Sequence, residues 1–226
     1  MNELMFFVCV VCCLGGVLFM YKVAGQRGLY AFAVFGTLIG NIAVCKCITL
    51  FGLETTGGNV IYAATFLTTD ILSEFYGKKA ASRAVKYSFI TMLMWLVGTQ
   101  LILLFAPSES DYVNESLKVI FGLAPRITGA SLCGFLCSQN IDVFLYHYIW
   151  KKSGDTKKKL WLRNNGSTLT SQAIDTLIFT TLAFYGTYPT PVFISIVITT
   201  YVFKAGVALL DTPFIYLAGK LKPMEE

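Results

Sequence analysis

Long apolar runs, separated by short polar segments, make up most of the chain. The seven runs cover residues 5–21, 28–50, 60–75, 87–106, 127–150, 167–185 and 192–218. A helix needs about 20 residues to cross the hydrocarbon core of a bilayer, and most of these runs are near that length. The pattern therefore predicts an all-α fold, a polytopic bundle of six or seven transmembrane helices, with six if the short third run is re-entrant. Residues 1–226 are expected to form a single membrane domain.

The charged residues between the runs predict how the chain is oriented. Lys and Arg accumulate in cytoplasmic loops. In this chain they follow the first, third, fifth and seventh runs, whereas the other connections are acidic, mixed or uncharged. The N-terminus is therefore expected outside and the C-terminus in the cytoplasm. The basic residues concerned are Lys22, Arg27, Lys78, Lys79, Arg83, Lys86, Lys151, Lys152, Lys157, Lys158, Lys159, Arg163, Lys220 and Lys222.

The composition excludes most soluble functions. Apolar residues make up 55% of the chain, charged residues 14%, and the mean hydropathy is +0.64, whereas soluble domains carry about 25% charged residues. No phosphate-binding loop, zinc-protease helix or nucleophile elbow occurs, so no enzyme activity is expected. The seven cysteines lie inside apolar runs and the chain has a single histidine, so no metal or other cofactor is expected. Topology explains the net charge of +5, and no nucleic-acid partner is expected.

A short polar string occurs twice within the apolar runs. Residues 138–142 read SQNID and residues 171–175 read SQAID. In each copy the Ser, Gln and Asp stand at relative positions 0, 1 and 4, which share one face of a helix. The two runs cross the membrane in opposite directions, and each Asp lies about 12–18 Å of helix rise from the basic loop between them. The pattern predicts two antiparallel helices that present matched amides and carboxylates at similar depth.

Further charged side chains are expected inside the bundle. Asp70 and Glu74 lie one helical turn apart, and Lys46 and Lys204 are expected to be buried cations. An ionised group at the bilayer centre costs at least about 2.5–3.5 kcal/mol, so such groups either form structural ion pairs or line a wet cavity. We favour a binding cavity framed by the second, third, fifth, sixth and seventh runs. The candidate substrate-binding residues are Asn41, Lys46, Asp70, Glu74, Gln139, Asp142, Gln172, Asp175 and Lys204.

An intramembrane aspartyl protease is a weaker alternative for the same residues. Asp142 and Asp175 could share a proton as the dyad of such an enzyme. The glycine-flanked aspartate that is usual in these proteases is missing from the chain. The sequence therefore favours a binding role over a catalytic one.

Several segments resemble the queuosine precursor transporter family, formerly grouped as vitamin-uptake-type membrane proteins. Residues 124–142 (APRITGASLCGFLCSQNID) are similar to its signature, and residues 163–175 (RNNGSTLTSQAID) to the second half of that signature. The likeness extends over residues 28–218. Its other landmarks are Asn41 with Lys46, residues 69–77 (TDILSEFYG), Phe203 with Lys204, and Thr212 with Pro213.

The resemblance implies import of 7-deazaguanines across the bacterial cytoplasmic (inner) membrane for salvage into queuosine-modified tRNA. The substrates it implies are the nitrile precursor, the aminomethyl precursor and queuine. Asp142 or Asp175 would accept the N–H groups of the guanine-like edge, and a second carboxylate, Asp70 or Glu74, would neutralise an amine. Side chains that could stack on the heterocycle are Phe75, Tyr76, Phe144 and Phe179.

The sequence leaves open how transport is powered and whether the protein assembles with a partner. The chain has no nucleotide-binding domain, so transport is either downhill, coupled to protons or ions, or powered by a partner. The main alternative is a substrate-binding subunit of an energy-coupling-factor importer for a vitamin-like heterocycle. Such a subunit would dock a coupling protein through small residues, and Gly15, Gly16, Gly36 and Gly40 could supply them. Apart from substrate and lipid bilayer, a homo-oligomer and a coupling subunit are both open as partners.

Overall fold

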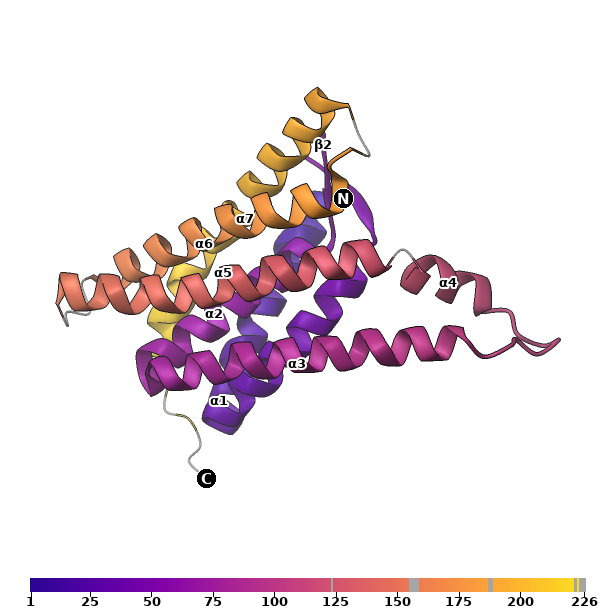
Figure 1. The fold of residues 1–226 in the computed structure, drawn as a ribbon. Coiled ribbons are helices and arrows are strands. Elements are labelled where there is room, and N and C mark those ends of the chain that lie inside the picture. The colour runs from indigo at the N-terminus through magenta and orange to yellow at the C-terminus, as the bar shows by residue number, and fades with distance from the viewer. Residues whose placement is uncertain (123, 155–158, 187–188, 222, 224–226) are drawn as a thin grey trace.

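The computed structural model describes residues 1–122, 124–154, 159–186, 189–221 and 223. These residues are nearly all helical, and the elements follow one another as Figure 1 shows. The helices are α1 (Asn2–Ala43), α2 (Gly58–Tyr76), α3 (Lys78–Leu103), α4 (Asn114–Gly122), α5 (Ala124–Ser153), α6 (Leu160–Phe184) and α7 (Thr190–Ala218). A two-stranded antiparallel hairpin, β1 (Cys47–Leu50) and β2 (Leu53–Thr56), connects α1 to α2.

Helix α1 consists of two antiparallel arms that contain the first two predicted runs. Its backbone leaves the helical conformation at Ala24 and Gly25, and Gly25 has a φ of +48°. A straight helix of this length would measure about 63 Å. Instead, the Asn2 side chain donates a hydrogen bond to the Thr49 carbonyl at 3.0 Å, so both ends of α1 lie together. The first two runs therefore form two separate helical arms, and whether each arm crosses the membrane stays a prediction.

The second predicted run ends differently from the expectation. The helix stops at Ala43, and the following residues form the β hairpin instead of a last helical turn. Phe51 and Gly52 close this hairpin, both with positive φ, as a two-residue type I′ loop requires. Lys46 lies in the turn before β1 and is exposed. The prediction that Lys46 is a buried cation is therefore wrong.

Two other helices begin earlier than the hydropathy pattern predicts. Helix α3 starts at Lys78, directly after a turn at Gly77, so the basic residues expected in a loop lie on its first turns. Helix α6 starts at Leu160, seven residues before the predicted run. As a result Arg163, expected in a cytoplasmic loop, lies inside the bundle with 1% of its surface exposed. The short helix α4 was not predicted.

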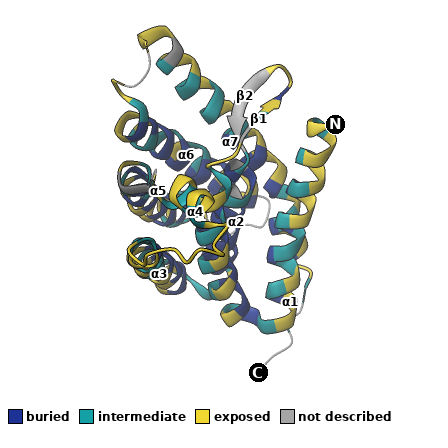
Figure 2. Ribbon diagram, turned by 90° about the vertical axis from the view of Figure 1, so that its right-hand side faces the viewer, coloured by how far each residue is buried: buried dark blue, intermediate teal, exposed yellow. Residues whose placement is uncertain are grey.

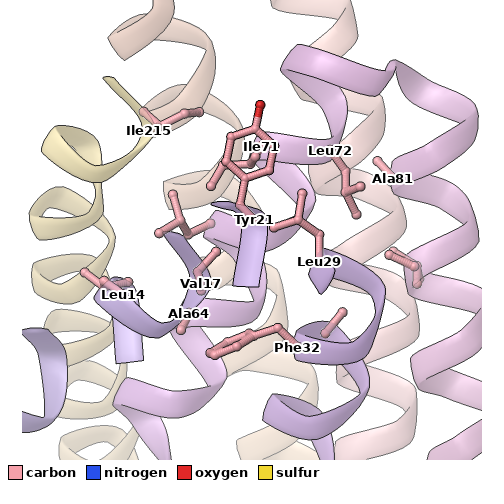
Figure 3. Close-up of a cluster of buried hydrophobic side chains, with 14 of the residues drawn as sticks. Leu14, Val17, Tyr21, Leu29, Phe32, Ala64, Ile71, Leu72, Ala81 and Ile215 are labelled. Atoms are coloured by element: carbon pink, nitrogen blue, oxygen red, sulfur yellow. The ribbon is translucent and has the colours of Figure 1, made fainter. Parts of the chain in front are cut away.

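The apolar core joins both arms of α1 to α2, α3 and α7. Figure 3 shows Leu14 and Val17 of one arm packed near Leu29 and Phe32 of the other, with Ile71 of α2 beside them. Burying one such side chain stabilises a fold by roughly 1.5–3 kcal/mol in water. The glycines considered for docking a partner mostly serve this packing. A Cβ at Gly16, Gly36 or Gly40 would lie 3.3 Å from Phe32, 3.0 Å from Thr65 or 3.9 Å from Tyr62, respectively, whereas Gly15 has no neighbour within 4 Å.

Many large apolar side chains are exposed on the helices, as lipid contact requires. Figure 2 shows the exposed positions along the outer faces of the bundle. Within the described residues, α1, α3 and Phe193–Ala218 of α7 are long and apolar enough to cross a membrane, and α4 with Arg126–Ser153 of α5 forms a bent fourth candidate. Helices α2 and α6 do not reach this hydropathy because their buried faces are polar. The fold is that of a helical membrane protein, and the number of spans and their sidedness stay predictions.

Basic residues gather at one end of the bundle. The bend of α1 lies beside the end of α2, since a Cβ at Gly25 would be 3.2 Å from the Tyr76 hydroxyl. This end therefore carries Lys22, Lys78 and Lys79, all exposed, whereas Glu3 lies with the β hairpin at the other end. These basic residues thus share one end of the bundle, and the assignment of that end to the cytoplasm stays a prediction. Lys157, Lys158 and Lys222 lie outside the described residues.

Candidate functional site

Three helices turn polar faces toward one another in the interior. The buried polar positions of α6 recur at the three- and four-residue spacing that forms one stripe along a helix. Both copies of the repeated string place their Ser, Gln and Asp in the interior, as predicted, and none of the six is more than 3% exposed. The buried polar residues of the three helices include Thr65, Thr69, Asp70 and Ser73 of α2, Ser138, Gln139 and Asp142 of α5, and Asn164, Thr168, Ser171, Gln172 and Asp175 of α6.

The two copies of the string bind each other reciprocally. Ser138 Oγ donates a hydrogen bond to Asp175 Oδ1 at 3.2 Å, and Ser171 Oγ donates to Asp142 Oδ1 at 2.9 Å. The serine of each copy thus holds the aspartate of the other, which only antiparallel helices at matched depth allow. Gly134 permits this approach, because a Cβ there would lie 2.9 Å from Asp175 Oδ1.

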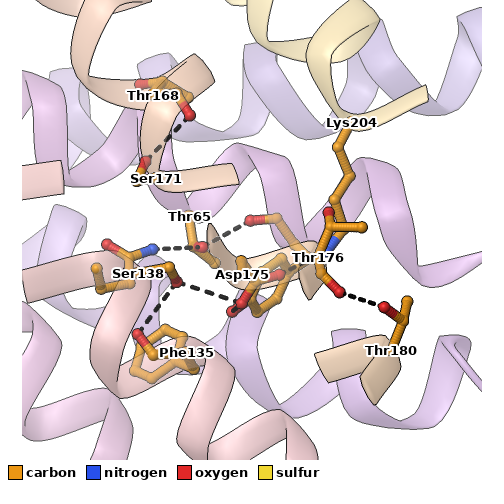
Figure 4. A network of polar contacts seen from close by, with 11 residues as sticks. Thr65, Phe135, Ser138, Thr168, Ser171, Asp175, Thr176, Thr180 and Lys204 are labelled. Carbon is orange, nitrogen blue, oxygen red and sulfur yellow. Dashed lines mark hydrogen bonds and ion pairs between the residues drawn. The ribbon is translucent and has the colours of Figure 1, made fainter. Parts of the chain in front are cut away.

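Asp175 is the centre of a first group of contacts, which we call the Asp175 group: Asp175, Lys204, Tyr62 and Ser138. Figure 4 shows Ser138 and Lys204 beside Asp175. Lys204 of α7 places Nζ 2.5 Å from Asp175 Oδ2, and the Tyr62 hydroxyl donates to Oδ1 at 3.0 Å. The lysine lies over the ring of Tyr62 at 5.1 Å and that of Phe179 at 6.0 Å. Because Asp175 and Lys204 are only 3% and 4% exposed, the prediction that Lys204 is a buried cation is confirmed.

The two glutamines of the strings differ in their hydrogen bonding. Gln139 donates from Nε2 to Thr65 Oγ1 and accepts at Oε1 from Thr69 Oγ1, both at 3.2 Å. Gln172 is fully buried, yet neither its Nε2 nor its Oε1 has a partner in the described part of the chain. Buried amides are nearly always hydrogen-bonded, so the unpaired Gln172 marks a place where a ligand could bind.

Asp70, Asp142 and Asp211 form a second group, which we call the carboxylate cluster. Each accepts one hydrogen bond through one oxygen: Asp70 from Thr168 at 3.1 Å, Asp142 from Ser171 at 2.9 Å, and Asp211 from Asn164 at 2.9 Å. Thr168 and Ser171 lie one turn apart on the same face of α6, so the carboxyl groups of Asp70 and Asp142 that they hold are neighbours. The three side chains come from α2, α5 and α7, and none is more than 1% exposed. The cluster therefore joins three helices around the polar face of α6.

Glu74 has protein partners at both oxygens, an arrangement that we call the Glu74 clamp. Arg163 donates from Nε to Oε2 at 2.9 Å and from Nη2 to Oε1 at 2.5 Å, and Tyr146 donates to Oε2 at 2.8 Å. The guanidinium also lies 4.5 Å from the ring of Trp150. The charge pattern places Arg163 among the loop cations, so this contact with Glu74 was not expected. The position of Arg163 directly before the two asparagines of the resembling segment was the signal that could have placed it.

Other expected residues lie away from these groups. Asn41 of α1 bonds to the Thr37 carbonyl and to Met92 Sδ of α3, both at 2.9 Å, and Lys46 is exposed as described above. Among the aromatic candidates Phe179 borders the Asp175 group, whereas Phe144 is 54% exposed and Phe75 stacks on Tyr21.

The site is closed in this structure. The buried polar side chains pack against one another, so the expected wet cavity is not found among the described residues. A small crevice adjoins Gln139, and its lining includes Thr65, Thr69 and Ser88. A substrate could reach the Asp175 group only after the helices around it move apart.

Comparison of the sequence with known proteins shows which family it matches. The family described as "Putative vitamin uptake transporter" matches residues 56–218, which include the three groups defined above. The chain is 43% identical over 210 residues to "Probable queuosine precursor transporter" of Bacillus subtilis (strain 168), covering 93% of this chain and 91% of that protein. It is 25% identical over 164 residues to "Queuosine precursor transporter" of Escherichia coli (strain K12), covering 70% of each. No solved structure matches the chain.

Proposed function

Because the chain belongs to the vitamin uptake transporter family, in which its curated relatives are named queuosine precursor transporters, we propose that it imports queuosine precursors across the bacterial cytoplasmic membrane. The family consists of transporters, which are not enzymes. The aspartyl-protease alternative is therefore set aside, and the buried carboxylates need a role in binding or transport.

This proposal rests mainly on the unpaired side-chain amide of Gln172. A primary amide presents an N–H donor beside a carbonyl acceptor, and this pair complements the C=O and N–H of the guanine-like edge that all 7-deazaguanine precursors share. Asp175 lies one helical turn further along α6 and on the same buried face. Its carboxylate is a suitable acceptor for the exocyclic amine of that edge, once its present partners rearrange.

Neighbouring side chains suit a flat heterocycle. The rings of Tyr62 and Phe179 flank the Lys204 ammonium, and Gln139 offers a second amide from the opposite copy of the string. Aromatic rings stack on planar heterocycles. We therefore propose substrate contacts with Gln139, Gln172, Asp175 and Lys204. This set excludes Asn41 and Glu74, which are bonded to other side chains, and Lys46, which is exposed.

The test is uptake into cells that can neither make nor otherwise import queuosine precursors. Each labelled precursor is supplied at limiting concentration, and queuosine in tRNA is the readout. Gln172→Leu loses two hydrogen bonds of about 1 kcal/mol each, which corresponds to roughly 30-fold weaker uptake. Asn140→Leu is the matched control, since Asn140 carries an exposed amide in the other copy of the string.

A second readout separates binding from folding. Removing an unpaired buried amide should leave the thermal unfolding midpoint of Gln172→Leu unchanged or higher, because an unsatisfied polar group destabilises the fold. Wild-type uptake by this variant would refute the proposed contact. Uptake by the wild type that requires an added ATPase partner would instead identify the protein as the binding subunit of an energy-coupling-factor importer.

A further inference from the structure

The charges of the interior are unevenly balanced. Asp175 is paired with Lys204 and Glu74 with Arg163. Asp70, Asp142 and Asp211 have no basic partner in the described residues, although each is at least 99% buried. Buried ionised groups without a counter-charge are strongly disfavoured. The carboxylate cluster therefore needs positive charge from outside the protein.

The cluster also lacks hydrogen-bond donors. Asp70 Oδ1, Asp142 Oδ2 and Asp211 Oδ2 have no donor in the part of the chain that the structure describes. Asn164 is fully buried and directed into the cluster by its bond to Asp211, and its own Oδ1 also lacks a donor there. Four buried acceptors without a donor indicate that something supplying O–H or N–H bonds belongs at this place.

We propose that Asp70 and Asp142 share a proton and that this proton crosses the membrane together with the substrate, an inference that rests on the proposed import function. A proton on one of these two neighbouring carboxyl groups lets it donate to the other, which converts two repelling acceptors into one O–H···O bond. A metal ion fits less well, because no group of three His, Cys, Asp or Glu among the described residues has a metal-binding arrangement. The proton binds a carboxylate oxygen from the outer solution and leaves to the cytoplasm, so no bond other than O–H is made or broken.

The position of the pair links the proton to substrate binding. Asp142 is held by Ser171, the direct neighbour of Gln172, and stands one turn from Gln139 on α5. Without the proton, repulsion between Asp70 and Asp142 pushes α2 and α5 apart. The closed bundle therefore forms when the pair is protonated, and this makes the proton a requirement for the step that carries bound substrate across.

The side chains around the Asp70–Asp142 pair belong to several helices. The groups of α2, α5, α6 and α7 near it are acidic, aromatic or already paired, whereas α1 and α3 face the adjoining crevice with uncharged Ala33, Ala84, Val85 and Ser88. The titratable and charged groups nearby are Asp211, Tyr146, the Glu74–Arg163 pair with His147 and Lys78 beyond it, and the Asp175–Lys204 pair.

The experiment uses the purified full chain in sealed vesicles. An inward proton gradient is imposed, accumulation of a labelled aminomethyl or nitrile precursor is measured, and a dye inside the vesicles reports pH. We expect accumulation of at least tenfold that a protonophore abolishes, together with acidification of the lumen when substrate is added. Accumulation that ignores the proton gradient or the protonophore, or that a sodium gradient drives instead, would overturn the proposal.

Variants locate the proton on the pair. Asp70→Asn and Asp142→Asn are each expected to lower the ratio of gradient-driven accumulation to substrate exchange at least tenfold, while Glu109→Gln, an exposed loop carboxylate, leaves this ratio unchanged. An unaltered ratio in both variants would refute the assignment. Wild-type vesicles that exchange substrate without proton flux would overturn only this inference, whereas vesicles without any substrate exchange would overturn the proposed function as well.

Discussion

The buried Asp175–Lys204 pair allows a quantitative prediction about charge inside the bundle. Both side chains are almost fully buried, and Lys204 Nζ lies 2.5 Å from Asp175 Oδ2. In Lys204→Met the carboxylate keeps its hydroxyl donors but loses its counter-charge. Removing one partner of a buried ion pair costs roughly 3–5 kcal/mol, because the other charge is left uncompensated. In the double variant Asp175→Asn with Lys204→Met no charge remains, so most of this loss should return.

The assay is unfolding of the purified protein in detergent micelles, compared with uptake in cells. Lys118 and Glu115 supply the control, since they form a 2.8 Å pair whose side chains are 51% and 82% exposed. An exposed pair contributes about 0–1 kcal/mol, so Lys118→Met should hardly change stability. We expect Lys204→Met to be the least stable variant, and the double variant to regain stability without regaining uptake.

Two results would refute this reasoning. If Lys204→Met were as stable as Lys118→Met, the pair would carry no net charge interaction in the folded state. If the double variant were no more stable than Lys204→Met, the loss would come from the removed lysine chain itself and its contacts with Tyr62 and Phe179. A double-mutant cycle separates these cases.

Two further predictions concern the geometry around α6. Gly134→Ala should lower uptake at least tenfold in the cellular assay, because its Cβ would lie 2.9 Å from Asp175 Oδ1, whereas Gly129→Ala, with no atom within 4 Å, should retain uptake. Arg163→Lys should lower the free energy of unfolding by about 2 kcal/mol, because a lysine cannot reproduce the bidentate hydrogen bonds to Glu74. An unchanged unfolding midpoint would show that the clamp is dispensable.

Helical periodicity was sufficient to predict the faces of α5 and α6. The spacing of Ser, Gln and Asp is local information, and it correctly places both strings in the interior at matched depth. Helical spacing does not identify the residues on other helices that contact these side chains. Glu74 and Arg163 stand 89 residues apart, and hydropathy assigns a run of polar residues to a loop unless partners from other helices are known. The early start of α6 and the buried Arg163 were missed for this reason.

The error at Lys46 has a different physical origin. Hydropathy measures only apolar character, and an apolar segment of this length can be either a helix end or a strand. The turn at Phe51 and Gly52 decides in favour of strands, because positive φ at two successive residues closes a hairpin. The first arm of α1 then contacts this hairpin at Thr49, a tertiary contact that the pattern of a single run does not encode.

The repeated string explains why one small bundle can hold two kinds of polar group. The two copies are equivalent in their local bonds, since the aspartate of each accepts from the serine of the other. They differ in their neighbours: Asp175 is paired with the cation Lys204, whereas the neighbour of Asp142 along α6 is a second carboxylate, Asp70. A carboxylate beside a cation has its charge balanced within the protein and can accept N–H groups from a ligand, while two neighbouring carboxylates repel each other unless a proton lies between them. Under the two proposals, the same motif supplies a substrate contact on one helix and a proton carrier on the other, and helices outside the repeat determine which role each copy takes.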